Sequence, residues 1–266
     1  MPRPRNYGIF TEPPITGIDE SGLPMNSRYE KQVILPEVGE IGQERFINSK
    51  AAVVGAGGLG SPALYYLAAA GIGTIRIIDD DTVDITNLNR QIIHTEKDLG
   101  REKRQSAKEK LISFNSGVKV DAVHARLGKT NAVELLSGFD IVMSCVDSNA
   151  ARYIINAACI SNQTPLINGG VEGFCGYVMA VLPGETPCFQ CVFPYPEGEG
   201  RSTADRGVLG AGAGAVGSLM AAEAIKVLLG LPVRPCFYYI DLLSTQIIPV
   251  KAQKTVGCPI CGRSEI

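Results

Sequence analysis

A glycine-rich loop is the first feature of the sequence whose residue types and spacing can do chemistry. Residues 55–60 read Gly-Ala-Gly-Gly-Leu-Gly and follow an apolar segment at 51–54. Glycines at this spacing let the backbone approach a phosphate, and the helix that follows offers its free N–H groups to the anion. Asp79 lies 19 residues after Gly60, where a carboxylate can bind ribose hydroxyls. The pattern predicts a nucleotide site, and a glycine turn that serves packing alone is the alternative.

Polar residues further along the chain indicate which nucleotide binds. Arg90, flanked by Asn87 and Gln91, follows the acidic segment, and Lys103 opens the next predicted helix. Arginine binds phosphate through a planar fork of donors, and lysine supplies a second cation. Asp147 follows a later predicted strand, at the end of the sheet where α/β proteins bind ligands. A dehydrogenase binds its dinucleotide with little added charge, so we predict an ATP site with Mg²⁺ instead of an NAD site.

We therefore predict Arg90, Lys103 and Asp147 as catalytic residues. A solvated surface charge is the alternative for each of them taken alone. An NAD-dependent oxidoreductase is a more distant alternative, because the sequence shows no pair of residues suited to relay a proton.

Two pairs of cysteines have the spacing of metal ligands. Cys188 and Cys191 form one Cys-x-x-Cys pair, and Cys258 and Cys261 form the other. Four thiolates bind zinc tetrahedrally and leave no coordination position open, which is typical of a structural site. We predict a structural Zn²⁺ that ties the C-terminal segment to the loop after residue 182. A redox pair is the alternative, although neither pair lies in a strand–helix setting of the thioredoxin type.

The elements that must position these residues alternate between strands and helices over most of the chain. Strands are predicted at residues 51–54, 75–78, 118–123, 140–145 and 166–167, and helices from about 61, at 101–114 and at 149–161. Later strands are predicted at 177–182, 238–240 and 246–248, the last two antiparallel, with a helix at 215–229. We predict an α/β fold with a Rossmann-like, doubly wound and mainly parallel sheet and antiparallel C-terminal strands, in one domain over residues 28–266.

Composition excludes several classes of protein. The 266 residues have 45% hydrophobic and 20% charged residues and a net charge of −2. This sequence therefore lacks the excess of positive charge that binds nucleic acid or an anionic membrane. No apolar run reaches the ~18–20 residues that span a bilayer. Residues 1–27, rich in proline and polar residues, are predicted to form an extended arm or a partly disordered tail and not a signal peptide, with docking to a partner as the alternative use. We predict a cytoplasmic protein whose eight cysteines are reduced or bind metal.

Several separated motifs, in one order, resemble those of the MoeB/ThiF/HesA family, the prokaryotic relatives of the ubiquitin-activating enzymes. The resemblance runs from about Arg28 to Cys261. The matching segments are residues 28–32, the glycine loop with Ser61 and Pro62, residues 79–91, 100–103 and 145–147, both Cys-x-x-Cys pairs, and residues 217–219.

What the resemblance implies is adenylation of a carboxylate by a homodimeric enzyme. A small ubiquitin-like sulfur carrier would lay its C-terminal Gly-Gly tail along the site. The tail carboxylate would attack the α-phosphate of ATP and release pyrophosphate, in molybdopterin or thiamine sulfur transfer. The resemblance assigns the ribose to Asp79, the phosphates to Asn87 and Arg90, the developing charge to Lys103, Mg²⁺ to Asp147, and the close backbone approach to Gly58. The predicted cofactor-binding residues are then Gly55, Gly57, Gly58, Asp79, Asp81, Asn87, Arg90, Gln91, Lys103, Asp147, Ser148 and Lys31.

Three positions depart from the family pattern. Lys31 stands where the family has the second arginine of its N-terminal motif, and in the family an N-terminal arginine reaches the partner's triphosphate. Lysine keeps the charge but loses the bidentate fork. Arg28 is the alternative residue for this contact with the partner. Ser148 replaces the asparagine of an Asp-Asn pair. Thr203 stands where many members carry a cysteine, and a hydroxyl is a far poorer nucleophile than a thiolate. We therefore expect the reaction to end at the acyl-adenylate, with no thioester on this loop.

Two other functions stay open at this point. The chain could adenylate a peptide precursor or another carboxylate, or it could bind the carrier without turning over ATP. The retained Arg90, Lys103 and Asp147 argue against the second of these.

The remaining histidines and cysteines are given structural roles. His94 and His124 are not expected to be catalytic, because the substrate carboxylate is already ionised. His94 follows the Asn-Arg-Gln segment directly, so either a structural role or a role in the ATP loop stays open for it. Three cysteines outside the two pairs are expected to be buried apolar residues: Cys145, Cys159 and Cys236. Cys175 follows the same expectation because it lies by an apolar segment, with a covalent intermediate on its thiol as the alternative.

Overall fold

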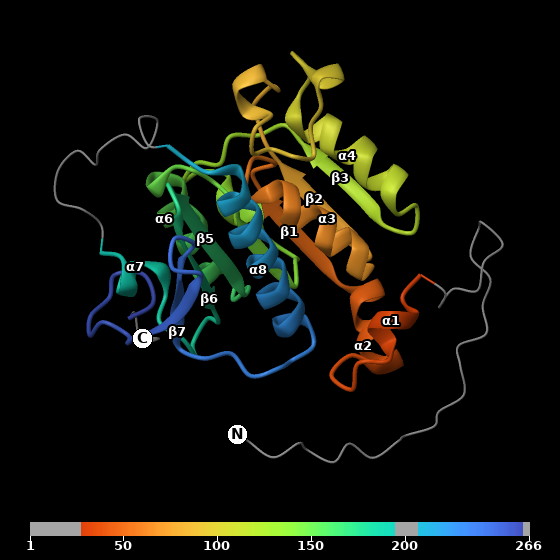
Figure 1. Cartoon of the computed structure of the whole chain (residues 1–266). Helices are drawn as coiled ribbons and strands as arrows, with labels where there is room; N and C mark the ends of the chain where they lie inside the picture. Colours follow the sequence, from red (N-terminus) through yellow and green to blue (C-terminus); the bar gives the residue numbers. More distant parts are fainter. Residues whose placement is uncertain (1–27, 195–206, 263–266) are drawn as a thin grey trace.

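The computed structural model describes residues 28–194 and 207–262 (Figure 1). The predictions for the arm at 1–27 and for Thr203 lie outside the described residues. The strands are β1 (Lys50–Val54), β2 (Thr74–Ile78), β3 (Lys119–Val123), β4 (Ile141–Ser144), β5 (Leu166–Glu172), β6 (Cys175–Val181), β7 (Cys236–Asp241) and β8 (Gln246–Lys251). The helices are α1 (Glu30–Val33), α2 (Gly39–Asn48), α3 (Gly60–Ala70), α4 (Lys103–Phe114), α5 (Ala132–Leu135), α6 (Asn149–Ser161), α7 (Phe189–Val192) and α8 (Gly210–Leu228).

These strands form one sheet in the order β3-β2-β1-β4-β5-β6-β7-β8. The pairs among β1 to β5 are parallel, and β6, β7 and β8 each join the sheet antiparallel to the strand before them. The chain runs from β1 to β2 and β3 on one side and then returns to β4 on the other. The sheet therefore has a topological switch point between β1 and β4, where α/β proteins bind ligands. The predicted fold class is confirmed.

The side chains of β1 alternate between two apolar cores, one on each face of the sheet. Ala51 and Val53 belong to the core that α3, α4 and α8 cover, whereas Ala52 and Val54 belong to the core with α5 and α6. Figure 1 shows α3 and α8 crossing one face, with α6 on the other. Burial on both faces explains why the central strands read as continuous apolar runs.

Helices α3 and α8 pack closely because small residues lie at their contact. α3 has Pro62 in its first turn and is capped after Ala70 by Gly71, whose φ of 82° is left-handed, as the sequence predicts. A Cβ at Gly217 of α8 would lie 2.4 Å from the Leu59 carbonyl oxygen and 2.6 Å from Pro62 Cγ. Only glycine at 217 lets α8 reach the start of α3, which follows the glycine loop.

Helix α8 corrects two expectations. It begins at Gly210, earlier than the predicted start at 215, because three glycines among its first five residues weaken the helical signal. By length and composition alone, this helix is also apolar enough to cross a membrane, although we expected no such run. Val216 and Met220 are buried in the core against the sheet, so α8 is interpreted as a core helix.

Strand β5 extends further than its sequence pattern indicates. β5 continues past the predicted 166–167 through Gly169 and Gly170, which have no strand propensity of their own. A Cβ at Gly169 would lie 2.3 Å from Met220 Sδ, and one at Gly170 would lie 2.4 Å from Tyr177 Cε1. These glycines therefore serve close packing of α8 and β6 against β5. The helices α1, α5 and α7, with four residues each, are too short to show a periodic pattern.

Candidate active site

The predicted site residues gather at the carboxyl ends of three neighbouring strands, on both sides of the switch point. The glycine loop follows β1, Asp79 follows β2, and Asp147 follows shortly after β4. The loop is tight, since Gly55 has a φ of 97° and a Cβ at Gly60 would lie 2.0 Å from the Gly55 carbonyl oxygen. The backbone of the turn itself therefore requires these two glycines.

A cavity of about 440 Å³ opens at these strand ends, and we name it the nucleotide cavity. Its lining includes seven predicted residues: Gly55, Gly57, Asp79, Asp81, Lys103, Asp147 and Ser148. Ser148 also caps α6, whose first turn borders the cavity with its positive end. A Cβ at Gly57 would meet nothing closer than Gln91 Nε2 at 3.6 Å. Packing does not require this glycine, and its place in the lining leaves room for a ligand.

Asp79 shapes the glycine loop as well as lining the cavity. Its Oδ2 accepts a hydrogen bond from the Ala56 N–H at 2.8 Å, and its Oδ1 accepts one from the Asp81 N–H at 2.9 Å. Burial raises the pKa of the Asp79 carboxyl, although these hydrogen bonds and the nearby Lys103 act in the opposite direction. Each carboxylate oxygen keeps a second lone pair, which is available to a ribose hydroxyl.

Lys103 is a buried cation in the wall of the nucleotide cavity. Its Nζ lies 2.9 Å from Asp81 Oδ2, and its backbone N–H donates to the Asp81 carbonyl oxygen at 2.9 Å. The start of α4 is thus tied to the segment after β2 through both backbone and side chain. An ammonium group held in this place can meet the negative charge of a phosphate chain.

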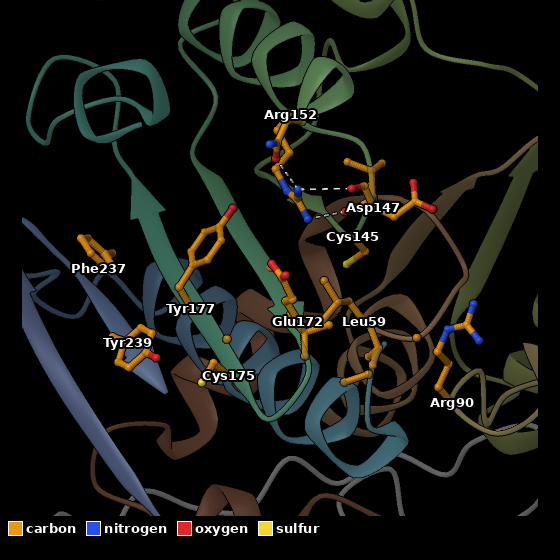
Figure 2. Close-up of a pocket in the computed structure, with 18 of the residues that line it drawn as sticks. Leu59, Arg90, Cys145, Asp147, Arg152, Glu172, Cys175, Tyr177, Phe237 and Tyr239 are labelled. Atoms are coloured by element: carbon orange, nitrogen blue, oxygen red, sulfur yellow. Dashed lines mark hydrogen bonds between the residues drawn. The ribbon is translucent and has the colours of Figure 1, made fainter. Parts of the chain in front are cut away.

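A second cavity of about 580 Å³ borders the first, and we name it the adjoining cavity (Figure 2). The two cavities share Cys145, Val146 and Asp147 in their linings. The adjoining cavity is also lined by three predicted residues, Gly58, Arg90 and Gln91, and by the rings of Tyr177, Phe193, Phe237 and Tyr239. Asp147 is exposed at the border. Its carboxylate is placed where a nucleotide in one cavity and a second substrate in the other would meet.

Two arginines of these cavities are absent from the predicted site residues. Arg126 lines the nucleotide cavity and Arg152 lines the adjoining cavity. Arg152 is 6% exposed and donates to the carbonyl oxygens of Val146 at 2.6 Å and Gly169 at 3.2 Å. It therefore holds the turn before Asp147 against β5 (Figure 2). The sequence does not indicate this role for Arg152, because the residue lies near the start of a predicted helix and arginine is common on helix surfaces.

Arg90 and Asn87 lie in the same segment after β2 but are placed differently. Arg90 lines the adjoining cavity, and its Nη1 donates to the Thr86 carbonyl oxygen at 2.9 Å and to Asn89 Oδ1 at 3.1 Å. Asn87 lines neither cavity, and its Oδ1 accepts from the Asp84 N–H at 3.2 Å in a capping box. The structure therefore places Arg90 at the site. The Asn87 side chain is instead used in the capping box of a local turn.

Lys31 lies away from both cavities of its own chain. The segment around α1 is anchored where α3 and α4 end: Gln32 Nε2 donates to the Ala70 carbonyl oxygen at 3.1 Å, and Arg28 Nη1 to that of Phe114 at 3.2 Å. Because α3 and α4 begin near the carboxyl ends of the strands, their last turns lie near the amino ends of the strands, on the side of the sheet opposite the cavities (Figure 1). A contact between Lys31 and a bound nucleotide therefore requires a second chain.

The two histidines line neither cavity. His94 is 4% exposed, and its ring nitrogens lie 2.9 Å from Ser106 Oγ and 2.9 Å from the Ala56 carbonyl oxygen. Burial lowers the pKa of His94 to about 4. His124 lies at the surface, with its Nδ1 3.2 Å from Glu102 Oε1. Neither ring is placed to take a proton from a substrate in either cavity.

The predicted zinc ligands form one cluster, with their four sulfur atoms within 4.8 Å of one another: Cys188, Cys191, Cys258 and Cys261. Three Sγ–Sγ distances are 3.8, 3.7 and 3.3 Å. A tetrahedral Zn²⁺ with Zn–S bonds near 2.3 Å sets its sulfurs about 3.8 Å apart. The donor set and its spacing therefore fit a closed four-thiolate site.

The other cysteines differ in their burial. Cys145, Cys159 and Cys236 are buried, as expected, and burial raises the pKa of Cys145 and Cys159 to about 12. Cys175 is half-buried and lines the adjoining cavity, so the prediction that it packs in the core is wrong. It opens β6, where the strand leaves the core, and the sequence does not show that this end faces a cavity.

The fold and the site define a class of protein: an α/β enzyme with a nucleotide cavity at the switch point of its sheet and a second cavity beside it. The sequence matches the ThiF family over residues 29–260. The chain belongs to this family, and the predicted adenylyltransferase class is confirmed.

Similar proteins cover nearly the whole chain. The sulfur carrier protein adenylyltransferase of Thermus thermophilus is 41% identical over 88% of this chain and 90% of that protein. The SAMP-activating enzyme E1 of Haloferax volcanii is 38% identical, with 90% of each chain covered. The sulfur carrier protein ThiS adenylyltransferase of Escherichia coli is 37% identical over 89% of this chain and 95% of that one. The solved structure of E. coli MccB with MccA-N7isoASN has a TM-score of 0.77 at 23% identity, covers 92% of this chain and 77% of that one, and shows the shared fold.

Proposed function

We propose that this protein adenylates the C-terminal glycine carboxylate of a small ubiquitin-like sulfur carrier with a Gly-Gly tail. The observation behind this proposal is the pair of cavities that meet at Asp147. ATP occupies the nucleotide cavity, and the extended tail enters through the adjoining cavity. Relatives of 37–41% identity that are named for sulfur carrier activation support the choice of substrate.

The reaction is an in-line displacement at the α-phosphorus. An oxygen of the ionised tail carboxylate forms a bond to this phosphorus, and the bond from the phosphorus to the oxygen bridging the α- and β-phosphates breaks. Pyrophosphate leaves with that electron pair, and no proton moves, so the enzyme needs no general base. Its tasks are positioning and charge stabilisation. Lys103 and Arg90 balance the phosphate charge, and Asp79 orients the ribose.

Two metals belong to the proposal. Asp147 would hold Mg²⁺, which supplies charge neutralisation on the phosphates when bound. The four clustered cysteines would hold a structural Zn²⁺ that joins α7 to the C-terminal segment, with no role in the chemistry. A reducing, cytoplasmic location agrees with free thiols at the other described cysteines.

We also propose that the active form is a homodimer in which Lys31 of each chain serves the nucleotide cavity of the other. The proposal is supported by the location of Lys31, which lies near the amino ends of the strands, away from both cavities of its own chain. Mixing subunits tests it: Lys31→Ala and Lys103→Met chains, each inactive alone, should regain activity when mixed, because the mixed dimer has one intact site. A Lys31→Ala enzyme with full activity, or mixed chains without recovery, would count against the shared site.

ATP–pyrophosphate exchange tests the proposed reaction. Exchange that depends on a ubiquitin-like carrier with a Gly-Gly tail supports the proposal. Exchange that depends on a free peptide and not on the carrier would favour the peptide-precursor alternative. No exchange with either, together with tight carrier binding, would favour a module that binds without turnover.

A further inference from the structure

Ala56 makes two hydrogen bonds that fix consecutive peptide planes in the glycine loop. Its N–H donates to Asp79 Oδ2 at 2.8 Å, which orients the plane between Gly55 and Ala56. Its carbonyl oxygen lies 2.9 Å from His94 Nε2, which orients the plane between Ala56 and Gly57. The reaction described above gives Asp79 a role and leaves His94 without one.

The surroundings of His94 determine which ring nitrogen carries the proton. Lys110 Nζ, which can only donate, lies 2.7 Å from Ser106 Oγ, so this oxygen accepts from it. The single proton of the Ser106 hydroxyl is then free to be donated to His94 Nδ1 at 2.9 Å. The Ala56 carbonyl can only accept, so Nε2 must carry the ring proton. A neutral imidazole protonated at Nε2 therefore satisfies both neighbours.

The bond to Ala56 has a consequence for the next residue. None of the peptide bonds among the described residues is cis, and in a trans peptide the C=O and the following N–H point in opposite directions. With the Ala56 carbonyl turned to His94, the Gly57 N–H is turned away from it. Gly57 lines the nucleotide cavity, and no described residue accepts a hydrogen bond from its N–H. This donor is available to a phosphate oxygen.

His94 also joins the other two parts of the phosphate site. Its backbone N–H donates to the Gln91 carbonyl oxygen at 3.0 Å, so the ring follows directly on the segment that carries Arg90. Ser106 lies on α4, one turn after Lys103. A single buried imidazole thus ties the glycine loop, the Arg90 segment and the start of α4 together.

We propose that His94 is a positioning residue for the nucleotide: it holds the Ala56 carbonyl so that the Gly57 N–H faces the phosphates. This inference rests on the proposed function, because it assigns ATP to the nucleotide cavity. His94 touches no substrate and exchanges no proton in the reaction.

Two variants of His94 separate the two ring nitrogens. In His94→Gln the amide nitrogen reaches the place of Nε2 and can still donate to Ala56. In His94→Asn the shorter amide reaches only the place of Nδ1, so the bond to Ala56 is lost. Thr186→Val is the matched stability control, since Thr186 is buried and accepts from the Leu182 N–H at 2.8 Å, outside both cavities.

The measurements are ATP affinity by calorimetry with Mg²⁺ and no carrier, and melting temperature. We expect His94→Asn to weaken ATP binding about 10-fold or more, His94→Gln about threefold or less, and Thr186→Val not at all despite a lower melting temperature. Equal affinity in wild type and His94→Asn, or equal losses in both His94 variants, would overturn the role of His94 and leave the proposed function standing. A wild type that binds no ATP would refute the proposed function itself. If His94→Asn does not fold, Ser106→Ala replaces it, and unchanged ATP affinity there would overturn the role.

Discussion

Lys103 Nζ lies 2.9 Å from Asp81 Oδ2, with the lysine side chain 8% exposed and the carboxylate side chain 68% exposed. A cation that is nearly buried is thus held by a carboxylate that reaches into solvent at the edge of the nucleotide cavity. This arrangement keeps the ammonium group in place before ATP arrives. The phosphate chain of ATP can then bind Lys103 together with Asp81, or it can take the place of the Asp81 carboxylate.

This pair predicts unequal effects of two isosteric substitutions. Lys103→Met removes the charge that meets the phosphates and should lower the turnover of ATP–pyrophosphate exchange by about 100-fold or more. Asp81→Asn keeps the lysine and should lower the turnover of exchange by less than about 10-fold. Steady-state exchange kinetics check both, with melting temperatures to confirm folding. A Lys103→Met enzyme as active as Asp81→Asn would contradict the role given to the lysine.

The glycine loop predicts a second contrast. At Gly57 a Cβ meets only Gln91, at 3.6 Å, so Gly57→Ala should fold with a stability close to wild type. The added methyl group would occupy space in the nucleotide cavity, and ATP affinity should fall at least about 10-fold. At Gly60 a Cβ lies 2.0 Å from the Gly55 carbonyl oxygen, so Gly60→Ala should destabilise the fold by several kcal/mol, on the order of a severe core mutation. Thermal unfolding and calorimetry separate the two, and a Gly57→Ala chain that binds ATP with wild-type affinity would contradict the placement of the nucleotide against Gly57.

His94 predicts a dependence of stability on pH. Its pKa is about 4 in the folded protein, below the ordinary value near 6.5, so the unfolded state binds its proton first as pH falls. Stability should therefore decrease between about pH 6.5 and 4, by about 1–2 kcal/mol at pH 5. Comparing urea unfolding of wild type and His94→Gln at pH 7 and pH 5 isolates this contribution. The same loss in both proteins would mean that His94 is not the responsible group.

The cysteine cluster predicts about one equivalent of zinc per chain. Cys188→Ser and Cys258→Ser should each reduce the bound zinc below about half an equivalent and lower the melting temperature, because binding of a structural metal adds to the folding free energy. Cys175→Ser, which lies outside the cluster, is the control and should keep its zinc. Metal analysis of the purified proteins checks this, and wild type with less than half an equivalent would argue against the site.

The sequence predicts most of the nucleotide side of the site, for reasons that can be given residue by residue. Gly55, Gly60 and Asp79 are separated by one strand–helix–strand unit, so local spacing alone determines their arrangement. The meeting of β1 and β4, which brings Asp147 opposite the glycine loop, follows from the alternation of elements. The cysteine cluster follows from ligand chemistry, since four thiolates at this spacing have few other uses.

The adjoining cavity could not be predicted in the same way. Its walls come from segments far apart in the chain, such as Arg152 on α6, Cys175 on β6 and Phe237 on β7. Nothing in the local sequence shows that Arg152 turns inward to carbonyl oxygens or that Cys175 faces a cavity. The sequence places His94 beside the Arg90 segment, but it cannot show the partners of the ring, because Ala56 and Ser106 are contributed by other elements.

The central claim is that ATP in the nucleotide cavity and a carrier tail in the adjoining cavity meet at Asp147. ATP–pyrophosphate exchange, measured with an intact ubiquitin-like carrier and with the same carrier lacking its last glycine, tests it most directly. We predict exchange with the intact carrier alone, and its loss by about 100-fold or more in an Asp147→Asn enzyme. Exchange that continues with the shortened carrier, or that is unaffected by Asp147→Asn, would contradict the account.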